Sequence, residues 1–151
     1  MSETNAIRIA NVRYAGTGLQ LIVRWTNNRE MTVNLEEPVY RLKGLRALRS
    51  QAVFARAGVG EDGCSVVWPG DIDMGADRLW EIALEQNGHA DAAEFIRWRW
   101  KHGLSLTAAA EALGLSRRTV AYYVSGKQAV PRTVLLALKG WEQETRKSAV
   151  A

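Results

Sequence analysis

Apolar and polar residues alternate along the first part of the chain. Every second position is apolar over residues 19–25 and again over residues 31–35. Because successive side chains of a strand point to opposite faces, this alternation predicts two half-buried strands. Asn27 and Asn28 lie between them and tolerate the positive φ of a tight turn, so we expect a hairpin. Residues 6–14, 53–60 and 64–69 predict up to three further short strands, and residues 61–63 (EDG) predict a turn between the last two.

Helical spacing interrupts this pattern twice. Leu42, Leu45 and Leu48 recur every third position within residues 37–50, which predicts a helix. Asp77 is placed to cap or begin a second helix over residues 77–86, and Gly88 suits the left-handed turn that ends it. We therefore expect residues 1–88 to form an α+β domain, a short antiparallel β-meander with one or two helices.

Beyond residue 89 the apolar spacing is helical throughout. Residues 90–103, 104–114, 117–125 and 132–144 predict four helices joined by short turns. Gly114 can take the left-handed turn after the second, and Ser116 is a good N-cap for the third. The residues expected to face inward are Ala92, Phe95, Ile96, Trp98, Leu106, Ala109, Ala110, Leu113, Val120 and Tyr123.

The helix predicted after Ser116 has a second face that is not apolar. At 100° per residue, a set of five residues lies within an arc of about 140° opposite Val120 and Tyr123. These five are Arg117, Arg118, Ala121, Tyr122 and Ser125. Two arginines at the helix start and one small residue at the centre suit a helix whose first half enters the DNA major groove.

The charge of the chain supports this interpretation only after it is divided. The net charge is +4 over 151 residues. Residues 1–88 contain ten Lys or Arg against eleven Asp or Glu, whereas residues 89–151 contain ten against five. A neutral domain joined to a basic one is typical of a nucleic-acid-binding module with a partner domain. We place the boundary so that residues 1–88 and 89–151 are separate domains.

The stretch "LTAAAEALGLSRRTVAYYVSGKQAVP" resembles the helix-turn-helix of the λ-repressor or Xre type. The matching positions are Thr107, Ala110, Gly114, Leu115, Ser116, Val120, Gly126, Lys127 and Pro131. The resemblance implies an all-α λ-repressor-like domain over residues 89–151 that binds double-stranded DNA. It places Arg117, Arg118 and Tyr122 at base-contacting positions, and Thr107, Ser125 and Lys127 at phosphate-contacting positions.

Arginine can form two parallel hydrogen bonds with guanine, so the resemblance suggests a half-site that contains G. A phosphate contact, which positions without specifying, is the alternative for each arginine. The chain departs from the family at one pair of positions. Many members pair an arginine of the first helix with a glutamate, but here Arg99 is matched by Val124. Arg99 must therefore be exposed, or find another partner such as Glu111.

The first domain resembles an uncharacterised bacterial α+β family. The resemblance rests on "LIVRWTNNREMTVNL" and "SVVWPGDIDMGADRLWE" and covers about residues 5–86. Members are fused to helix-turn-helix modules or encoded beside toxin-like proteins. The resemblance therefore implies an antitoxin-like regulator with a toxin-like protein partner, and it implies no chemistry.

No catalytic or cofactor site emerges from the sequence. The chain has no phosphate-binding glycine motif, no nucleophile with an evident His partner, and no calcium-loop spacing around Asp71, Asp73 and Asp77. We therefore expect no enzyme, metal or cofactor. The single cysteine, Cys64, is expected to be buried. Without a membrane-spanning run or a secretory signal, a cytoplasmic protein is expected.

Two features bear on partners. The basic run Arg41, Lys43, Arg46 and Arg49 is interpreted as a solvated helix face, with an acidic partner or flanking DNA as the alternative. In the last helix, Leu135 and Leu136 point away from the stripe of Val134, Ala137, Leu138 and Trp141. They suggest a second contact, and we expect a homodimer on paired half-sites.

Two hypotheses follow from these patterns. The first is a sequence-specific transcriptional regulator, in which helix 116–125 reads the major groove. The alternative is a protein-interaction module that keeps the helix-turn-helix scaffold without binding DNA.

Overall fold

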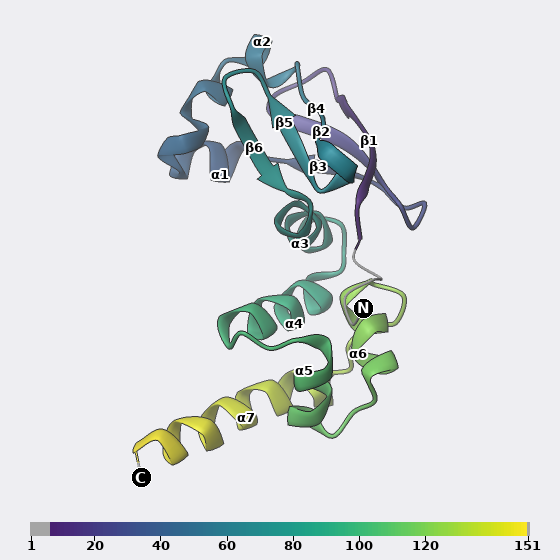
Figure 1. Cartoon of the computed structure of the whole chain (residues 1–151), viewed down its shortest axis with the longest axis vertical. Coiled ribbons are helices and arrows are strands. Elements are labelled where there is room, and N and C mark those ends of the chain that lie inside the picture. The colour runs from purple at the N-terminus through teal and green to yellow at the C-terminus, as the bar shows by residue number, and fades with distance from the viewer. Residues whose placement is uncertain (1–6, 151) are drawn as a thin grey trace. The chain divides into compact units, whose positions relative to one another are not determined.

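The computed structural model describes the backbone of residues 7–150 and the side chains of residues 7–147 (Figure 1). The chain forms two compact units. The N-terminal unit is Ala6–Asn87, and the C-terminal unit contains Gly88–Ala151.

The N-terminal unit contains the predicted hairpin. Its first sheet is antiparallel, in the order β1-β2-β3, with β1 at Ile9–Tyr14, β2 at Gln20–Trp25 and β3 at Glu30–Asn34. Leu21 pairs with Val33 and Val23 with Met31, so the apolar positions of β2 and β3 share one face. Asn28 takes a φ of 67° in the turn. The alternating pattern predicted here is confirmed.

The second sheet differs from the sequence-based expectation. It is antiparallel in the order β4-β5-β6, with β4 at Gly58–Val59, β5 at Ser65–Trp68 and β6 at Ile72–Gly75. The strand predicted for residues 53–60 is instead α2 (Gln51–Phe54) followed by the two-residue β4. No strand was predicted at β6, which is only four residues long. The unit therefore contains two meanders where one was expected.

The turn between β4 and β5 was predicted correctly and forms η2, Glu61–Gly63. Asp62 has a φ of 57°, and a Cβ on Gly63 would come within 2.5 Å of the Ile9 carbonyl oxygen. Cys64, which follows, is exposed, so its predicted burial was wrong. Cys64 takes an αR conformation before β5 begins, and the alternation that buries Val66 does not extend back to it.

The helix predicted for residues 37–50 is broken. α1 spans Glu36–Arg41, the backbone is extended at Leu42, and Lys43–Arg49 forms a 3-10 helix, η1. The leucines that suggested a helix recur every three residues, which is the repeat of a 3-10 helix. Leu45 and Leu48 consequently share the buried face of η1. A single α-helix would have carried these leucines around its surface.

α3 spans Ala76–Gln86 and packs against β3 and β6 (Figure 1). Its N-cap is Gly75, and Asp77 lies in its first turn, where a carboxylate favours the positive end of the helix dipole. Asp77 is thus the second residue of the helix rather than its N-cap or its first residue. At the other end, the side chains of Gln86 and Asn87 bond to backbone groups of β3, including the Asn34 N–H and carbonyl at 2.8 Å each. These amides satisfy the hydrogen-bonding potential of backbone groups at the outer edge of β3.

The core of the N-terminal unit joins the two sheets to the helices. The rings of Trp25 and Trp80 meet edge to face at 5.0 Å, and Trp68 Nε1 donates to the Phe54 carbonyl at 3.0 Å. Trp25, Phe54, Leu79 and Leu84 are fully buried.

The C-terminal unit is helical, as predicted. It contains α4 (Ala90–Lys101), α5 (Leu106–Leu113), α6 (Arg117–Val124) and α7 (Arg132–Val150). The buried side chains of its core are Phe95, Trp98, Leu106, Ala109, Ala110, Val120, Tyr123, Val130 and Leu138. Leu113 packs on this core from a half-buried position.

The burial of residues along α7 differs from the prediction. Leu135 packs against the core, whereas Ala137, which was expected to be buried, is exposed. Leu136 is 49% exposed. One leucine, rather than two, is therefore left over on this helix.

Candidate nucleic-acid interface

α5 and α6 form two eight-residue helices joined by a tight turn. Gly114 ends α5 with a φ of 69°, and the Leu115 N–H reaches back to the Ala110 carbonyl at 2.9 Å. This is the six-to-one hydrogen bond of a glycine C-cap of the Schellman type. Ser116 then caps α6, because its Oγ accepts from the Thr119 N–H at 3.0 Å. The turn and both caps fix where α6 starts.

The inner face of α6 determines which residues point outward. Val120 is fully buried and Tyr123 is 3% exposed. The ring of Tyr123 meets that of Phe95 from α4 edge to face at 5.4 Å. With these contacts made, the face predicted to bind DNA lies on the other side of the helix.

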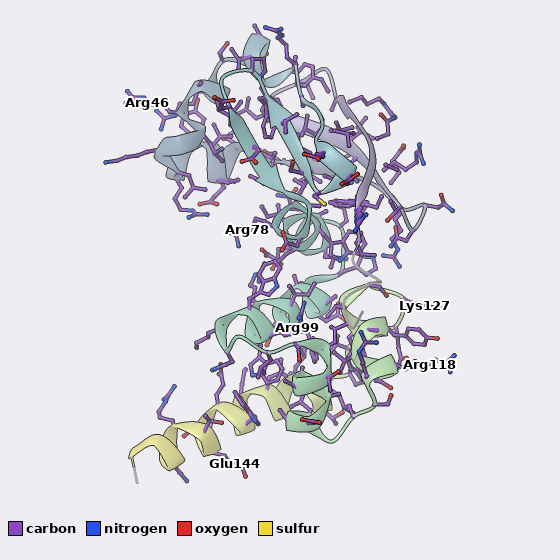
Figure 2. The ribbon with its side chains drawn as sticks, viewed as in Figure 1. Arg46, Arg78, Arg99, Arg118, Lys127 and Glu144 are labelled. Carbon is purple, nitrogen blue, oxygen red and sulfur yellow. The ribbon has the colours of Figure 1, made fainter. Side chains whose placement is uncertain are left out.

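Three residues of the predicted site meet on the outer side of α6. The Arg118 Nε donates to the Tyr122 hydroxyl at 2.9 Å, and its guanidinium lies 5.3 Å from the centre of the Tyr122 ring. The Lys127 ammonium lies 4.6 Å from the same ring centre. We call Arg118, Tyr122 and Lys127 the Tyr122 cluster. Figure 2 shows Arg118 and Lys127 on the same side of the C-terminal unit.

The cations of the Tyr122 cluster lower the pKa of the tyrosine hydroxyl. The hydrogen bond from Arg118, assisted by the charges of Arg118 and Lys127, lowers the pKa of Tyr122 below its ordinary value of 10.0. Two cations held against a partly exposed aromatic ring form a surface that attracts anions and can stack on planar groups.

The turn after α6 brings Lys127 to the cluster. Ser125 is half-buried, and its Oγ donates to the Tyr122 carbonyl at 3.3 Å and accepts from the Lys127 N–H at 3.4 Å. Gly126 follows with a φ of 75°. Ser125 therefore organises the turn in this structure.

The remaining predicted residues lie elsewhere on the motif. Arg117 is half-buried in the first turn of α6. Thr107 is exposed in the first turn of α5, next to Leu106 and after the N-cap Ser105. Ala121, the small residue at the centre of the outer face, is half-buried and packs at the margin of the core.

Arg99 resolves the departure from the family pattern. It is half-buried, and its Nη1 donates to the Leu104 carbonyl at 3.0 Å. It thus bonds to the backbone just beyond its own helix, and Glu111, which was offered as a partner, is exposed on α5. A valine at position 124 is compatible with this arrangement.

Two contacts that hold the motif were not predicted. Asp91 in the first turn of α4 accepts from the Val130 N–H at 2.7 Å, which ties the segment after α6 to α4. His102 and Glu142 share a hydrogen bond of 2.7 Å, and Lys101 lies 3.4 Å from the same carboxylate oxygen. These partners lie 39 and 40 residues apart, and no local pattern marks such pairs.

The Glu142 contact belongs to an aromatic cluster that attaches α7. The Trp141 ring lies 4.8 Å from His102 and 5.3 Å from Trp98, centre to centre. The hydrogen bond from His102 and the charge of Lys101 lower the pKa of Glu142 below 4.5. The cluster stabilises the scaffold that supports α5 and α6.

Over residues 7–147, no helix is long and apolar enough to cross a bilayer, and no three His, Cys, Asp or Glu side chains gather as metal ligands would.

Comparison with known proteins gives two matches. The sequence profile of a helix-turn-helix domain family matches residues 43–138. The crystal structure of a candidate DNA-binding protein from Nitrosomonas europaea ATCC 19718 is 33% identical to the chain, with a TM-score of 0.70. That match covers 90% of this chain and 86% of the Nitrosomonas chain. No curated protein matches.

Proposed function

Because the chain belongs to the helix-turn-helix domain family, we propose that it is a sequence-specific DNA-binding transcriptional regulator that reads the major groove with α6. One observation carries the proposal. Val120 and Tyr123 fix the inner face of α6 in the core, and Arg118 and Tyr122 are left on the outer side at the start and middle of the helix.

The base-contacting residues in this proposal are Arg117, Arg118 and Tyr122. Either arginine can form two parallel hydrogen bonds with the O6 and N7 atoms of guanine. The Arg118 Nε is used by Tyr122, so Arg118 presents its two terminal nitrogens. Tyr122 therefore serves both as a contact and as the residue that positions Arg118.

The phosphate-contacting residues in this proposal are Thr107, Ser125 and Lys127. Thr107 lies at the N-terminus of α5, where free backbone N–H groups and the helix dipole favour an anion. Lys127 is exposed beside the Tyr122 ring. Ser125 would exchange its 3.3 Å bond to the Tyr122 carbonyl for a phosphate oxygen.

We further propose that residues 89–151 form the DNA-binding domain, of the λ-repressor or Xre type, and that residues 1–88 serve dimerisation or partner binding. A homodimer would place two copies of α6 on half-sites about one helical turn apart. The resemblance of the first domain to antitoxin-like regulators makes a cytoplasmic autorepressor with a toxin-like partner the specific form of this proposal.

Selection of bound sequences from random duplex DNA, repeated at two salt concentrations, tests the proposal. We expect enrichment of a paired, G-containing motif with a steep dependence of affinity on salt. Salt-sensitive binding without enrichment would mean phosphate contact alone. Failure to retain DNA at low salt would favour the protein-interaction module.

A further inference from the structure

The 3-10 helix η1 carries three cations in a straight row. Because residues three apart eclipse in a 3-10 helix, Lys43, Arg46 and Arg49 project one above another. All three are exposed. At a rise of about 2.0 Å per residue, neighbours in the row are about 6 Å apart along the axis and the row is about 12 Å long. Figure 2 shows Arg46 on the side of this segment that faces away from the two sheets.

This cationic row lacks the counter-charges found elsewhere in the N-terminal unit. Residues 38–60 contain five Lys or Arg and no Asp or Glu, whereas residues 6–37 and 61–87 together contain five against ten. Among the described residues, no carboxylate pairs with a member of the row. Other arginines of the unit are paired, as in Arg13–Glu30, Arg41–Glu37 and Arg78–Glu81. The positive charge is therefore local and uncompensated.

The row is held in place at its Arg49 end and by the buried face of η1. The Arg49 Nη2 donates to the Tyr40 carbonyl at 3.3 Å, and its guanidinium lies 4.6 Å from the centre of the Tyr40 ring. On another face of η1, Leu45 and Leu48 are buried in the core. A cation that is already positioned loses less conformational entropy when it binds an anion.

We propose that the cationic row Lys43, Arg46 and Arg49 binds the phosphate backbone of DNA flanking the site read by α6. The inference rests on the proposed function, because DNA bound by the helix-turn-helix supplies the phosphates. Once α6 is bound, the tether between the units raises the effective concentration of DNA near the row. Each DNA strand carries a charge about every 3.4 Å of helix axis, so more than one phosphate lies within reach of a row about 12 Å long.

The test uses the full chain and three proteins of matched design. The first is wild type and the second is the row variant Lys43→Gln, Arg46→Gln, Arg49→Gln. The third is a control, Arg8→Gln, Arg13→Gln, Arg24→Gln, which removes the same charge from exposed positions of β1, β2 and the segment before them. Circular dichroism and thermal unfolding verify that each is folded. Affinity is measured for a selected site with flanking DNA and for an unrelated duplex, over a series of salt concentrations.

We expect the row variant to bind both duplexes at least about tenfold more weakly, and by a similar factor, because phosphate contacts carry no sequence information. The slope of log affinity against log salt should fall by about 2 to 3, near 0.9 for each lost contact. The control should change affinity by about twofold or less, as expected for screened charges.

Equal weakening of the row variant and the control would overturn the proposal, since net charge alone would explain it. A row variant with the affinity and the salt dependence of wild type would also overturn the proposal. The row would then be solvated or would bind an acidic protein. The proposed function fails in a different way, when wild type enriches no sequence. In that case a row variant that still loses non-specific affinity would support the row while ending sequence-specific reading.

Discussion

The Nε of Arg118 donates a hydrogen bond of 2.9 Å to the hydroxyl of Tyr122, one turn later on α6. Both side chains lie on the outer side of the helix, and Lys127 covers the same tyrosine ring at 4.6 Å. The bond sets the direction of the guanidinium before any ligand arrives. It also links the two residues energetically, so the effect of changing one depends on the other.

Tyr122→Phe tests this positioning. The variant keeps the ring under both cations and loses the hydroxyl that accepts from Arg118. Because one solvent-accessible hydrogen bond is lost, we expect a modest loss, roughly two- to fivefold, in affinity for a selected site. Fluorescence anisotropy with labelled duplex measures it. Tyr40→Phe is the control, and a Tyr122→Phe affinity equal to that of wild type would mean that Arg118 is oriented by other contacts.

The phenol of Tyr122 should ionise at lower pH than an ordinary tyrosine. Arg118 and Lys127 favour the phenolate and lower the pKa of Tyr122. The difference between the absorbance titrations of wild type and Tyr122→Phe at 295 nm reports this group alone. We expect a midpoint below 10 that moves upward in Arg118→Ala. A midpoint that does not respond to Arg118→Ala would show that the hydrogen bond is absent in solution.

Ser116 should matter for stability and for DNA binding separately. Removing its cap in Ser116→Ala should cost about 1 kcal/mol and fray the turn that carries Arg117 and Arg118. Ser116→Asn should restore both stability and affinity. Ser116→Asp should restore stability but bind DNA more weakly, because its charge faces phosphates. Urea unfolding measures the stability of the three variants, and DNA titration measures their affinity. Equal affinities of Ser116→Asn and Ser116→Asp would mean that the start of α6 does not lie close to DNA phosphates.

Glu142 should make stability depend on pH in the acid range. Its folded pKa is lowered, chiefly by the hydrogen bond from His102. Such a group stabilises the fold above its unfolded pKa, near 4.5, and this contribution is lost as pH falls through the folded value. We expect Glu142→Gln to be about 1 kcal/mol less stable at pH 6 and to approach wild type as the pH falls well below 4.5. Urea unfolding followed by tryptophan fluorescence measures both, and a constant difference would contradict the assignment.

The sequence predicted elements where one local rule governs. Alternation gave β2 and β3, and the Gly114 and Ser116 signals gave the turn and the start of α6. These features depend on neighbours in the chain. The outer face of α6 followed in turn, because burying Val120 and Tyr123 leaves a single orientation for the helix.

The failures occur where distant residues decide. β6 is a strand because β5 pairs with it along Ser65–Trp68, whereas its own four residues, IDMG, are too few to predict a strand by themselves. The repeat of three in η1 fits a 3-10 helix better than an α-helix, a distinction that helical spacing alone does not make. Leu135 is partly buried by the packing of α7, which no local pattern encodes. Within the candidate site, the Arg118–Tyr122 spacing of four residues was visible, but the approach of Lys127 depends on the Ser125 turn.

The most direct measurement is the affinity of Arg117→Ala, Arg118→Ala for a selected DNA site, compared with Lys139→Ala, Arg146→Ala. The second variant removes the same charge from exposed positions of α7. We expect the α6 variant to remain folded and to lose about 2–4 kcal/mol of specific binding, with a smaller loss on unrelated DNA. The α7 variant should lose little on either. Equal losses in the two variants, or unchanged specific affinity in the α6 variant, would contradict base reading by α6.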